Sequence, residues 1–350
     1  MNESLLRKNI REIKAYVPGK TISGLIKLAS NENPFGPSPK ALEAIKKETS
    51  NLHIYPDQSS NKLREALSNK FSLPAECFVC GNGSDDIMQV LAASYINQGD
   101  EVIISKNTFS VYELVSKIYD GNAVFVDLKE FAVDLGAISS AITSKTKIIF
   151  LTNPNNPTGT IFTAGEFDSF MKNIPENIIV VVDEAYAEFV ESKDYPDVLK
   201  YIKQGRNVIA LRTFSKFYGL AGIRIGYGIG PKELLAPLFK VKMPFNVNRL
   251  AQAAAVAALD DKKFLEKTFK NNAEGKKYFY SEFDKLEIDY KKTEANFIFV
   301  NLKRPAEEFA KSMVEKGVII RSLQSFGLPQ AIRVSIGLPA QNKKFVSLLK

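Results

Sequence analysis

The chain has 350 residues, of which 45% are hydrophobic and 25% are charged, a composition typical of a soluble protein with one large domain or two smaller ones. No apolar run reaches the roughly 18 residues that a membrane span needs, and the charged N-terminus lacks the apolar region of a secretory signal, so we expect a cytoplasmic protein. The net charge of +8 is spread along the chain between acidic residues, which argues against a nucleic-acid partner and suits small anionic substrates.

The two cysteines, Cys77 and Cys80, form a C-x-x-C pair, and His53 is the single histidine. A structural zinc site needs further thiolate or imidazole ligands. We therefore expect no metal site, and we interpret the two thiols as buried at the end of a strand.

Residues 1–35 are expected to form an N-terminal arm, which ends in the Pro-rich, extended segment "NENPFGPSP". Residues 36–245 then alternate between short apolar runs and helix-like stretches, for example residues 84–98 and 164–174. The runs are rich in Val and Ile and have no polar alternation, which indicates strands buried on both faces. The expected strands are residues 77–80, 101–105, 123–128, 147–152, 178–184, 208–213 and 223–229. This pattern predicts a large α/β domain with a mainly parallel sheet covered by helices.

The pattern changes after about residue 245. Residues 249–286 have few helix breakers and predict a long helical stretch. Apolar runs follow at 295–302, 317–323 and 331–337, and a last short segment ends the chain. Residues 246–350 are therefore expected to form a smaller α+β domain.

Polar motifs follow several of the predicted strands. Because ligands of open α/β sheets bind at the carboxyl ends of the strands, these motifs should meet at one edge. In "GNGSDD", Ser84 and Asp85 begin a helix whose free N–H groups could bind a phosphate, although a simple capped turn fits this motif equally well. In "NPNNPTG", two prolines and a glycine would hold Asn156 rigidly, or form an ordinary turn.

The two motifs with charged groups are more informative. Asp183 ends the strand "VVVD", and a buried carboxylate needs a cation or hydrogen-bond donors. Lys216 follows the strand "VIALRT", and a buried lysine becomes a nucleophilic amine because its pKa falls. A pyridoxal phosphate ligand would use the lysine, the carboxylate, the amide and the phosphate cradle together.

The motifs "LASNENPFGPSP", "YPD", "GNGSDDIM", "NPNNPTG", "DEAYAEF", "RTFSKFYGLAGIRIGY" and "IRVSIG" occur in this order over nearly the whole chain. The set resembles the fold-type I pyridoxal-phosphate-dependent aminotransferases, and within them the histidinol-phosphate aminotransferases. The resemblance implies a homodimer with shared active sites, and a reaction of histidine biosynthesis. In that reaction histidinol phosphate and 2-oxoglutarate are interconverted with imidazole-acetol phosphate and glutamate.

The resemblance also implies roles for single residues. Lys216 is the Schiff-base lysine that moves the proton, and Asp183 pairs with the pyridine nitrogen. The remaining cofactor contacts implied are Tyr186 and Asn156 to the ring hydroxyl oxygen, Tyr112 stacked on the ring, and Ser215, Arg224 and the amides of Ser84 and Asp85 on the phosphate. Tyr55 would reach the phosphate from the neighbouring subunit.

Substrate recognition is implied for Arg333, as a clamp for a substrate anion, and for Arg321 on the preceding strand, as a second cation. Tyr16 and Asn33 would line the same pocket. Arg321 could instead be a surface cation. Two other activities stay open, an aromatic amino-acid aminotransferase of broad range and a decarboxylase of phosphothreonine type with the same fold and cofactor.

Overall fold

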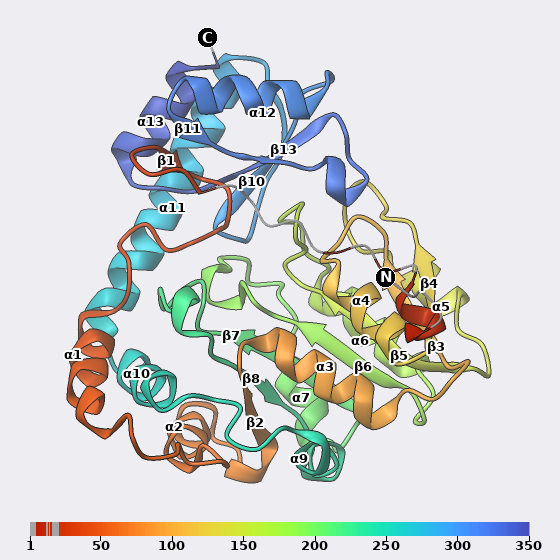
Figure 1. The fold of residues 1–350 in the computed structure, drawn as a ribbon. Coiled ribbons are helices and arrows are strands. Elements are labelled where there is room, and N and C mark those ends of the chain that lie inside the picture. Colours follow the sequence, from red (N-terminus) through yellow and green to blue (C-terminus); the bar gives the residue numbers. More distant parts are fainter. Residues whose placement is uncertain (1–4, 12, 14, 16–20, 350) are drawn as a thin grey trace.

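The computed structural model describes residues 5–11, 13, 15 and 21–349, which form a larger and a smaller unit (Figure 1). The larger unit contains a seven-stranded sheet with the order β2-β8-β7-β6-β5-β3-β4. The strands are β2 (Phe78–Gly81), β3 (Glu101–Ser105), β4 (Asn122–Val126), β5 (Thr146–Thr152), β6 (Ile179–Asp183), β7 (Val208–Thr213) and β8 (Gly226–Ile229). Strand β8 is antiparallel to both of its neighbours, and the other pairs are parallel. The expected α/β fold with a mainly parallel sheet is confirmed.

The central strands are apolar along most of their length because helices cover both faces of the sheet, and their polar residues lie at the strand ends. In β6, Val180 and Val182 belong to the hydrophobic core on one face, whereas Ile179 and Val181 belong to the core on the other face. Successive side chains of a strand point to opposite faces, so a strand buried on both sides is apolar on both of its faces. The run of valines and isoleucines in the sequence is the direct consequence.

Helices connect these strands and pack on the sheet (Figure 1). Their N-termini carry local signals, such as the capping box in which the Thr163 side chain accepts from the Glu166 N–H and the Glu166 carboxylate accepts from the Thr163 N–H. The helices of this part are α3 (Ser84–Tyr95), α4 (Val111–Ile118), α5 (Leu135–Ser140), α6 (Ala164–Asn173), α7 (Val198–Lys203), α8 (Lys232–Leu235) and α9 (Leu238–Val241).

The smaller unit is an antiparallel four-stranded sheet with the order β12-β13-β10-β9, covered by helices. Its elements are β9 (Asp289–Lys291), β10 (Phe297–Asn301), β12 (Arg321–Ser322), β13 (Ala331–Ser335), α11 (Lys262–Lys285), α12 (Ala306–Glu315) and α13 (Pro339–Ser347). A short strand of the N-terminal segment, β1 (Ile26–Lys27), pairs with β11 (Val318–Ile319) of this unit. The chain after β1 then runs to α1 (Pro39–Glu48), beside the larger unit, and so connects both units (Figure 1).

The stretch expected to be helical over residues 249–286 is helical, with one interruption. The structure has two helices, α10 (Arg249–Leu259) and α11, which are separated at Asp260 and Asp261. The Asp261 carboxylate caps α11 by accepting from the Phe264 N–H, and it also accepts from the Ser38 hydroxyl at 2.6 Å. The break therefore depends on a contact with a residue more than 200 positions away, which no local pattern reveals.

The alanine-rich helix α10 packs with α1 and with α2 (Asn61–Phe71), and four of its alanines, Ala251, Ala254, Ala255 and Ala258, belong to the core of the larger unit. The chain therefore passes between the units twice. The N-terminal segment runs from β1 in the smaller unit to α1, and the chain later runs from α10 in the larger unit to α11 in the smaller one. The domain boundaries expected at residues 35 and 245 stay a prediction.

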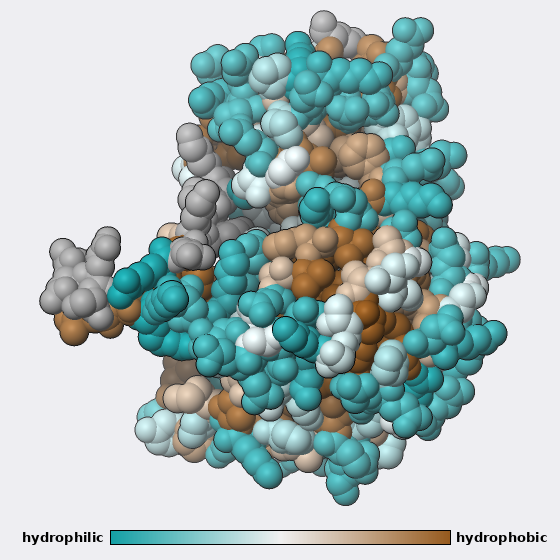
Figure 2. All heavy atoms as spheres, turned by 90° about the vertical axis from the view of Figure 1, so that its right-hand side faces the viewer, coloured by the Kyte–Doolittle hydropathy of each residue, from teal (hydrophilic) through white to brown (hydrophobic). Residues whose placement is uncertain are grey.

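Among the residues that the structure describes, no helix is both long and apolar enough to cross a membrane. Apart from Leu5, Leu6 and Ile22 of the N-terminal segment and Phe269 of α11, the exposed large hydrophobic residues of the described chain lie in the larger unit. Figure 2 shows the same contrast on one face, where the surface of the smaller unit is mostly hydrophilic and hydrophobic side chains gather over the middle of the larger unit. Surface suited to an apolar contact with another molecule is thus on the larger unit.

Candidate active site

A cavity of about 170 Å³ opens where β5, β6 and β7 end, and the last residue of each of these strands, Thr152, Asp183 and Thr213, lines it. This is the edge at which the sequence motifs were expected to meet. Nine of the predicted cofactor residues line the cavity together: Ser84, Asp85, Tyr112, Asn156, Asp183, Tyr186, Ser215, Lys216 and Arg224.

Lys216 lies in the turn that follows β7, and its amine donates a hydrogen bond of 3.0 Å to the carbonyl oxygen of Ser30. Burial, with a further contribution from the positive charge of Arg333, lowers the pKa of this amine from 10.5 to about 8. A substantial fraction of the amine is therefore neutral near pH 8, which is the form that attacks a carbonyl carbon or accepts a proton.

Asp183 is only 4% exposed, yet its hydrogen bonds come from neutral groups. The Tyr112 hydroxyl donates to Oδ2 at 2.6 Å and the Ala185 N–H donates to Oδ1 at 3.0 Å. Burial raises the pKa of this carboxyl from 3.8 to about 6. A cationic nitrogen bound in the cavity would supply the positive charge that a buried carboxylate needs.

The other end of the cavity is built to hold an anion. Arg224 has a φ of +60°, and its Nη1 donates to the Ser215 hydroxyl at 3.4 Å while its Nη2 lies 3.6 Å from Asp85 Oδ2. The first turn of α3 supplies N–H groups without partners inside the helix. A Cβ atom on Gly83, which has a φ of +90°, would lie only 2.3 Å from Arg224 Nη2. Only glycine therefore lets the arginine reach the helix N-terminus, and this combination of donors fits a phosphate.

The expected stacking role of Tyr112 disagrees with its position. The ring is 0% exposed and stacks on Phe150 with centroids 4.8 Å apart, so neither of its faces is open to a ligand. Only the hydroxyl edge of Tyr112 serves the site, through Asp183. Phe109, three residues earlier, lines the cavity and is only partly buried, which makes it the aromatic residue available to a ligand ring.

Asn156 and Tyr186 line the cavity and are held from behind by other residues. Arg333 in β13 donates to the Asn156 side-chain oxygen and, at 2.9 Å, to the carbonyl of Ala29. The Asn31 amide donates to the Tyr186 hydroxyl at 2.9 Å. Arg333 is therefore connected to the cavity through Asn156, although it does not line the cavity itself.

Arg321 in β12 lies directly opposite Arg333 in the register of the antiparallel pair. Side chains of opposite residues project from the same face of a sheet, so the two cations share one face. Arg321 is half-buried and donates to the Ser325 hydroxyl at 3.2 Å. It does not line the cavity.

Asn33 and Tyr16 were expected in the substrate pocket. The Asn33 amide is buried and donates to the Phe217 carbonyl and the Thr268 hydroxyl, and Asn33 does not line the cavity. Its contacts hold the turn that carries Lys216. Tyr16 lies outside the described residues.

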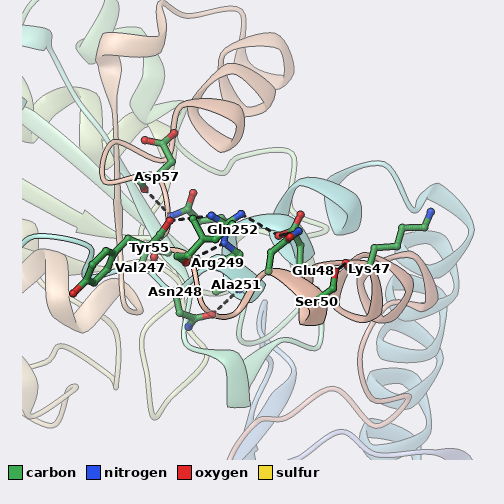
Figure 3. Close-up of polar contacts among 12 residues, drawn as sticks. Lys47, Glu48, Ser50, Tyr55, Asp57, Val247, Asn248, Arg249, Ala251 and Gln252 are labelled. Carbon is green, nitrogen blue, oxygen red and sulfur yellow. Dashed lines mark hydrogen bonds and ion pairs between the residues drawn. The ribbon is translucent and has the colours of Figure 1, made fainter.

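Tyr55 is 76% exposed and stacks on Phe245 with ring centroids 4.6 Å apart; it does not line the cavity of its own chain. Its main chain is fixed by Arg249, which donates to the carbonyl of Tyr55 at 2.9 Å and pairs with the Glu48 carboxylate at 3.2 Å (Figure 3). The tyrosine side chain points away from this polar cluster in the close-up. The backbone is anchored while the phenol remains at the surface.

Sequence reasoning missed several residues of the site. Those that line the cavity are Phe109, Thr152, Ala185, Thr213 and Ala221. Thr152 and Thr213 could have been found, because each is the last residue of a predicted strand. Asn31 stands in the motif "SNENP", but its contact with Tyr186 depends on the path of the N-terminal segment between the units.

Comparisons with known proteins agree with this geometry. The family model described as "Aminotransferase class I and II" matches residues 23–349. A histidinol-phosphate aminotransferase of Moorella thermoacetica is 46% identical, over 98% of this chain and 92% of the relative. One of Carboxydothermus hydrogenoformans is 42% identical, over 99% and 98%.

A solved structure of histidinol-phosphate aminotransferase from Sinorhizobium meliloti, in complex with pyridoxal-5'-phosphate, is similar to this fold with a TM-score of 0.90. It is 26% identical and the similarity covers 99% of this chain and 96% of the other. The chain therefore belongs to the class I and II aminotransferase family.

Proposed function

We propose that this protein is a pyridoxal-phosphate-dependent aminotransferase that interconverts histidinol phosphate and 2-oxoglutarate with imidazole-acetol phosphate and glutamate. Relatives that share 40% or more of their residues over nearly the whole chain carry the name of this activity. The observation that carries the proposal is the single cavity that brings Lys216, Asp183 and the anion-binding turn around Arg224 together.

The residues around the cavity fit the cofactor from end to end. Arg224, Ser215 and the start of α3 would hold the phosphate, and Asp183 would hold the ring nitrogen. Tyr186 and Asn156 would hold the ring hydroxyl oxygen. When bound, pyridoxal phosphate supplies a reactive carbonyl carbon and a ring that delocalises the electron pair left on the substrate carbon.

Lys216 has the properties of the group that moves the proton. Its lowered pKa leaves a neutral amine available at physiological pH, so Nζ can take a proton from the substrate carbon that bears the amino group and can deliver it again. The hydrogen bond to the Ser30 carbonyl keeps Nζ at the cavity wall. The buried Asp183 remains ionised above about pH 6, which favours the protonated ring nitrogen.

Arg333 and Arg321 are proposed to recognise the anionic group of either substrate. Their opposite positions in the β12–β13 pair put two cations on one face of the small unit's sheet. A guanidinium fork binds a phosphate or a carboxylate through two parallel hydrogen bonds, and both half-reactions bring one such group. Arg333 is also connected to the cavity through Asn156.

We also propose that the enzyme is a cytoplasmic homodimer in which Tyr55 serves the cofactor phosphate of the partner subunit. Tyr55 and its neighbours Leu52 and Ile54 are exposed, as are Met243 and Phe245 beside them. Lys242 donates to the Gln58 carbonyl at 2.9 Å, which ties the two segments together. Such an apolar surface that includes a phenol is suited to a second copy of the chain.

Steady-state kcat/KM values for histidinol phosphate, phenylalanine and tyrosine, each with 2-oxoglutarate, test the substrate. We expect histidinol phosphate to be preferred because the paired arginines bind a phosphate. A preference for an aromatic amino acid would overturn the substrate and leave the reaction type intact. Release of carbon dioxide from phosphothreonine would overturn the reaction type.

A further inference from the structure

Three consecutive residues of the N-terminal segment each contact a different residue of the site. The Ala29 carbonyl accepts from Arg333 and the Ser30 carbonyl accepts from Lys216, at 2.9 and 3.0 Å. The Asn31 amide donates to the Tyr186 hydroxyl at 2.9 Å. The segment lies between β1, which pairs with the small unit, and α1, which packs beside the large one. Of the three contacts, that of Asn31 is the one made by a side chain.

Asn31 is held in a single arrangement by its neighbours. It is 1% exposed and has a φ of +55°, a conformation that asparagine tolerates better than most residues. Its backbone N–H donates to the Ser335 hydroxyl at 2.9 Å, and the same hydroxyl donates to Asn31 Oδ1 at 3.0 Å. Its carbonyl accepts from the Asn296 amide at 3.0 Å.

These contacts determine which atom of the amide faces Tyr186. Because Oδ1 is occupied by the proton of Ser335, the NH2 group faces the tyrosine, and an NH2 group can only donate. The Tyr186 oxygen must therefore accept from Asn31. The proton of that hydroxyl is then left for another acceptor, and Tyr186 lines the cavity.

We propose that Asn31 is a positioning residue that holds the Tyr186 hydroxyl as a hydrogen-bond donor directed into the cavity, toward the ring hydroxyl oxygen of the bound cofactor. The inference rests on the proposed function, because it requires the cofactor ring beside Tyr186. A donor directed at that oxygen stabilises its ionised form. Loss of Asn31 should then weaken this stabilisation without removing any group that touches the cofactor.

The test is a pH titration of the visible absorption band of the holoenzyme, which reports the ionisation of the bound cofactor. Asn31→Gly deletes the amide and keeps the left-handed backbone, and we expect it to raise the apparent pKa of the band by several tenths of a pH unit. Asn31→Asp replaces the donor by an acceptor that draws the Tyr186 proton away, and it should raise the pKa by about one unit. If the role of Asn31 were purely structural, Asn31→Gly would shift the apparent pKa of the band more than Asn31→Asp does. That result would overturn the proposal.

A double-mutant cycle separates this role from general loosening of the segment. In a Tyr186→Phe background, Asn31→Gly should no longer shift the band, because its effect passes through the missing hydroxyl. An equal shift in both backgrounds would overturn the proposal. Asn342→Ala is the control, since Asn342 is a buried asparagine that hydrogen-bonds to Gly337 and does not line the cavity. A shift in Asn342→Ala as large as that in Asn31→Gly would also overturn it.

The same experiment distinguishes failure of this inference from failure of the proposed function. If Tyr186→Phe alone leaves the band unchanged, Tyr186 does not face the ring oxygen and the assigned cofactor geometry fails. If Tyr186→Phe shifts the band and Asn31→Gly does not, the cofactor geometry stands and the role of Asn31 fails.

Discussion

At the scale of the residue, Lys216 is the group on which the proposed reaction depends. Replacing it by alanine removes the amine and should abolish the visible band of the lysine-bound cofactor. Turnover should fall by about 10²–10⁴-fold or more, since a general acid–base contributes that much. Absorbance spectra and steady-state rates with histidinol phosphate check this. Lys270→Ala is the control, because Lys270 is a surface lysine with a side chain 77% exposed, and turnover that survives in Lys216→Ala would refute the assignment.

The burial of the same lysine also predicts a pH dependence of stability in the protein stripped of cofactor. The pKa is about 8 in the folded protein and 10.5 in the unfolded chain, so between these values the unfolded state binds more protons and stability rises with pH. Lys216→Met lacks this titration. We expect the variant to gain stability relative to the wild type at pH 7, and this gain to shrink by up to about 3 kcal/mol as pH rises to 10.5.

Urea unfolding of both cofactor-free proteins at a series of pH values measures this difference. A stability difference that stays constant from pH 7 to 10.5 would show that the lysine is not desolvated in the fold.

The residues of the site divide clearly into those that a sequence reveals and those that it does not. Asp183 and Lys216 follow apolar runs, so their positions at the sheet edge come from strand topology alone. Tyr112 and Phe109 are aromatic residues within one turn of each other, and only the packing of Tyr112 on Phe150 decides which of them faces the ligand. Asn31 acts through a contact 155 residues away, for which a single sequence carries no signal.

At the scale of the element, the segment of residues 54–57 has no regular structure of its own and is held by α10. Arg249 donates to the carbonyls of Ile54 and Tyr55, and Gln252 donates to the Asp57 carbonyl at 2.8 Å (Figure 3). Because α10 fixes the backbone carbonyls of this segment, the exposed Tyr55 side chain extends from a backbone of defined position. An interface that uses a preorganised side chain avoids the cost of ordering it on binding.

Arg249→Ala should therefore weaken the association of the proposed dimer more than it destabilises the fold of the subunit. We expect the dimer dissociation constant to rise about tenfold, equivalent to about 1.4 kcal/mol, because the segment that carries Tyr55 loses its anchor. Sedimentation velocity over a range of concentrations measures this constant. Lys47→Ala is the control, since the Lys47 side chain forms an exposed ion pair with Glu43 in the neighbouring helix α1. An unchanged dissociation constant in Arg249→Ala would contradict the anchoring role.

The elements themselves were largely predictable. All seven strands of the large sheet coincide with apolar runs. Most of them do so because a strand buried on both faces has a continuous hydrophobic sequence, whereas the edge strand β4 is only partly buried. The division between α10 and α11 was not predictable, since Asp260 and Asp261 are tolerated in a helix and the break is stabilised by Ser38 from the other end of the chain. A burial pattern can be predicted from neighbouring residues of the sequence. A helix break that is stabilised by a distant residue cannot be predicted in this way.

At the scale of the whole molecule, the site draws on parts of the chain that lie far apart. The large unit supplies the cavity, the small unit supplies Arg333, and the N-terminal segment contacts both. The proposed dimer adds Tyr55 from a second chain. A mixture of two defective subunits tests the contribution of Tyr55 directly. In a mixed dimer one site would contain both substitutions, and the other site would be complete.

Tyr55→Phe keeps the ring that stacks on Phe245 and removes the hydroxyl, so we expect cofactor to bind about ten- to hundredfold more weakly. When Tyr55→Phe and Lys216→Ala chains are unfolded and refolded together, half of the dimers should be mixed. Each mixed dimer has one site with an intact Lys216 and the tyrosine of the other chain. At a cofactor concentration that saturates only the wild type, the mixture should recover roughly a quarter of wild-type turnover. If Tyr55 served its own chain, every site with Lys216 would lack the hydroxyl, and turnover would be about half that of the Tyr55→Phe protein, because half of the chains lack Lys216.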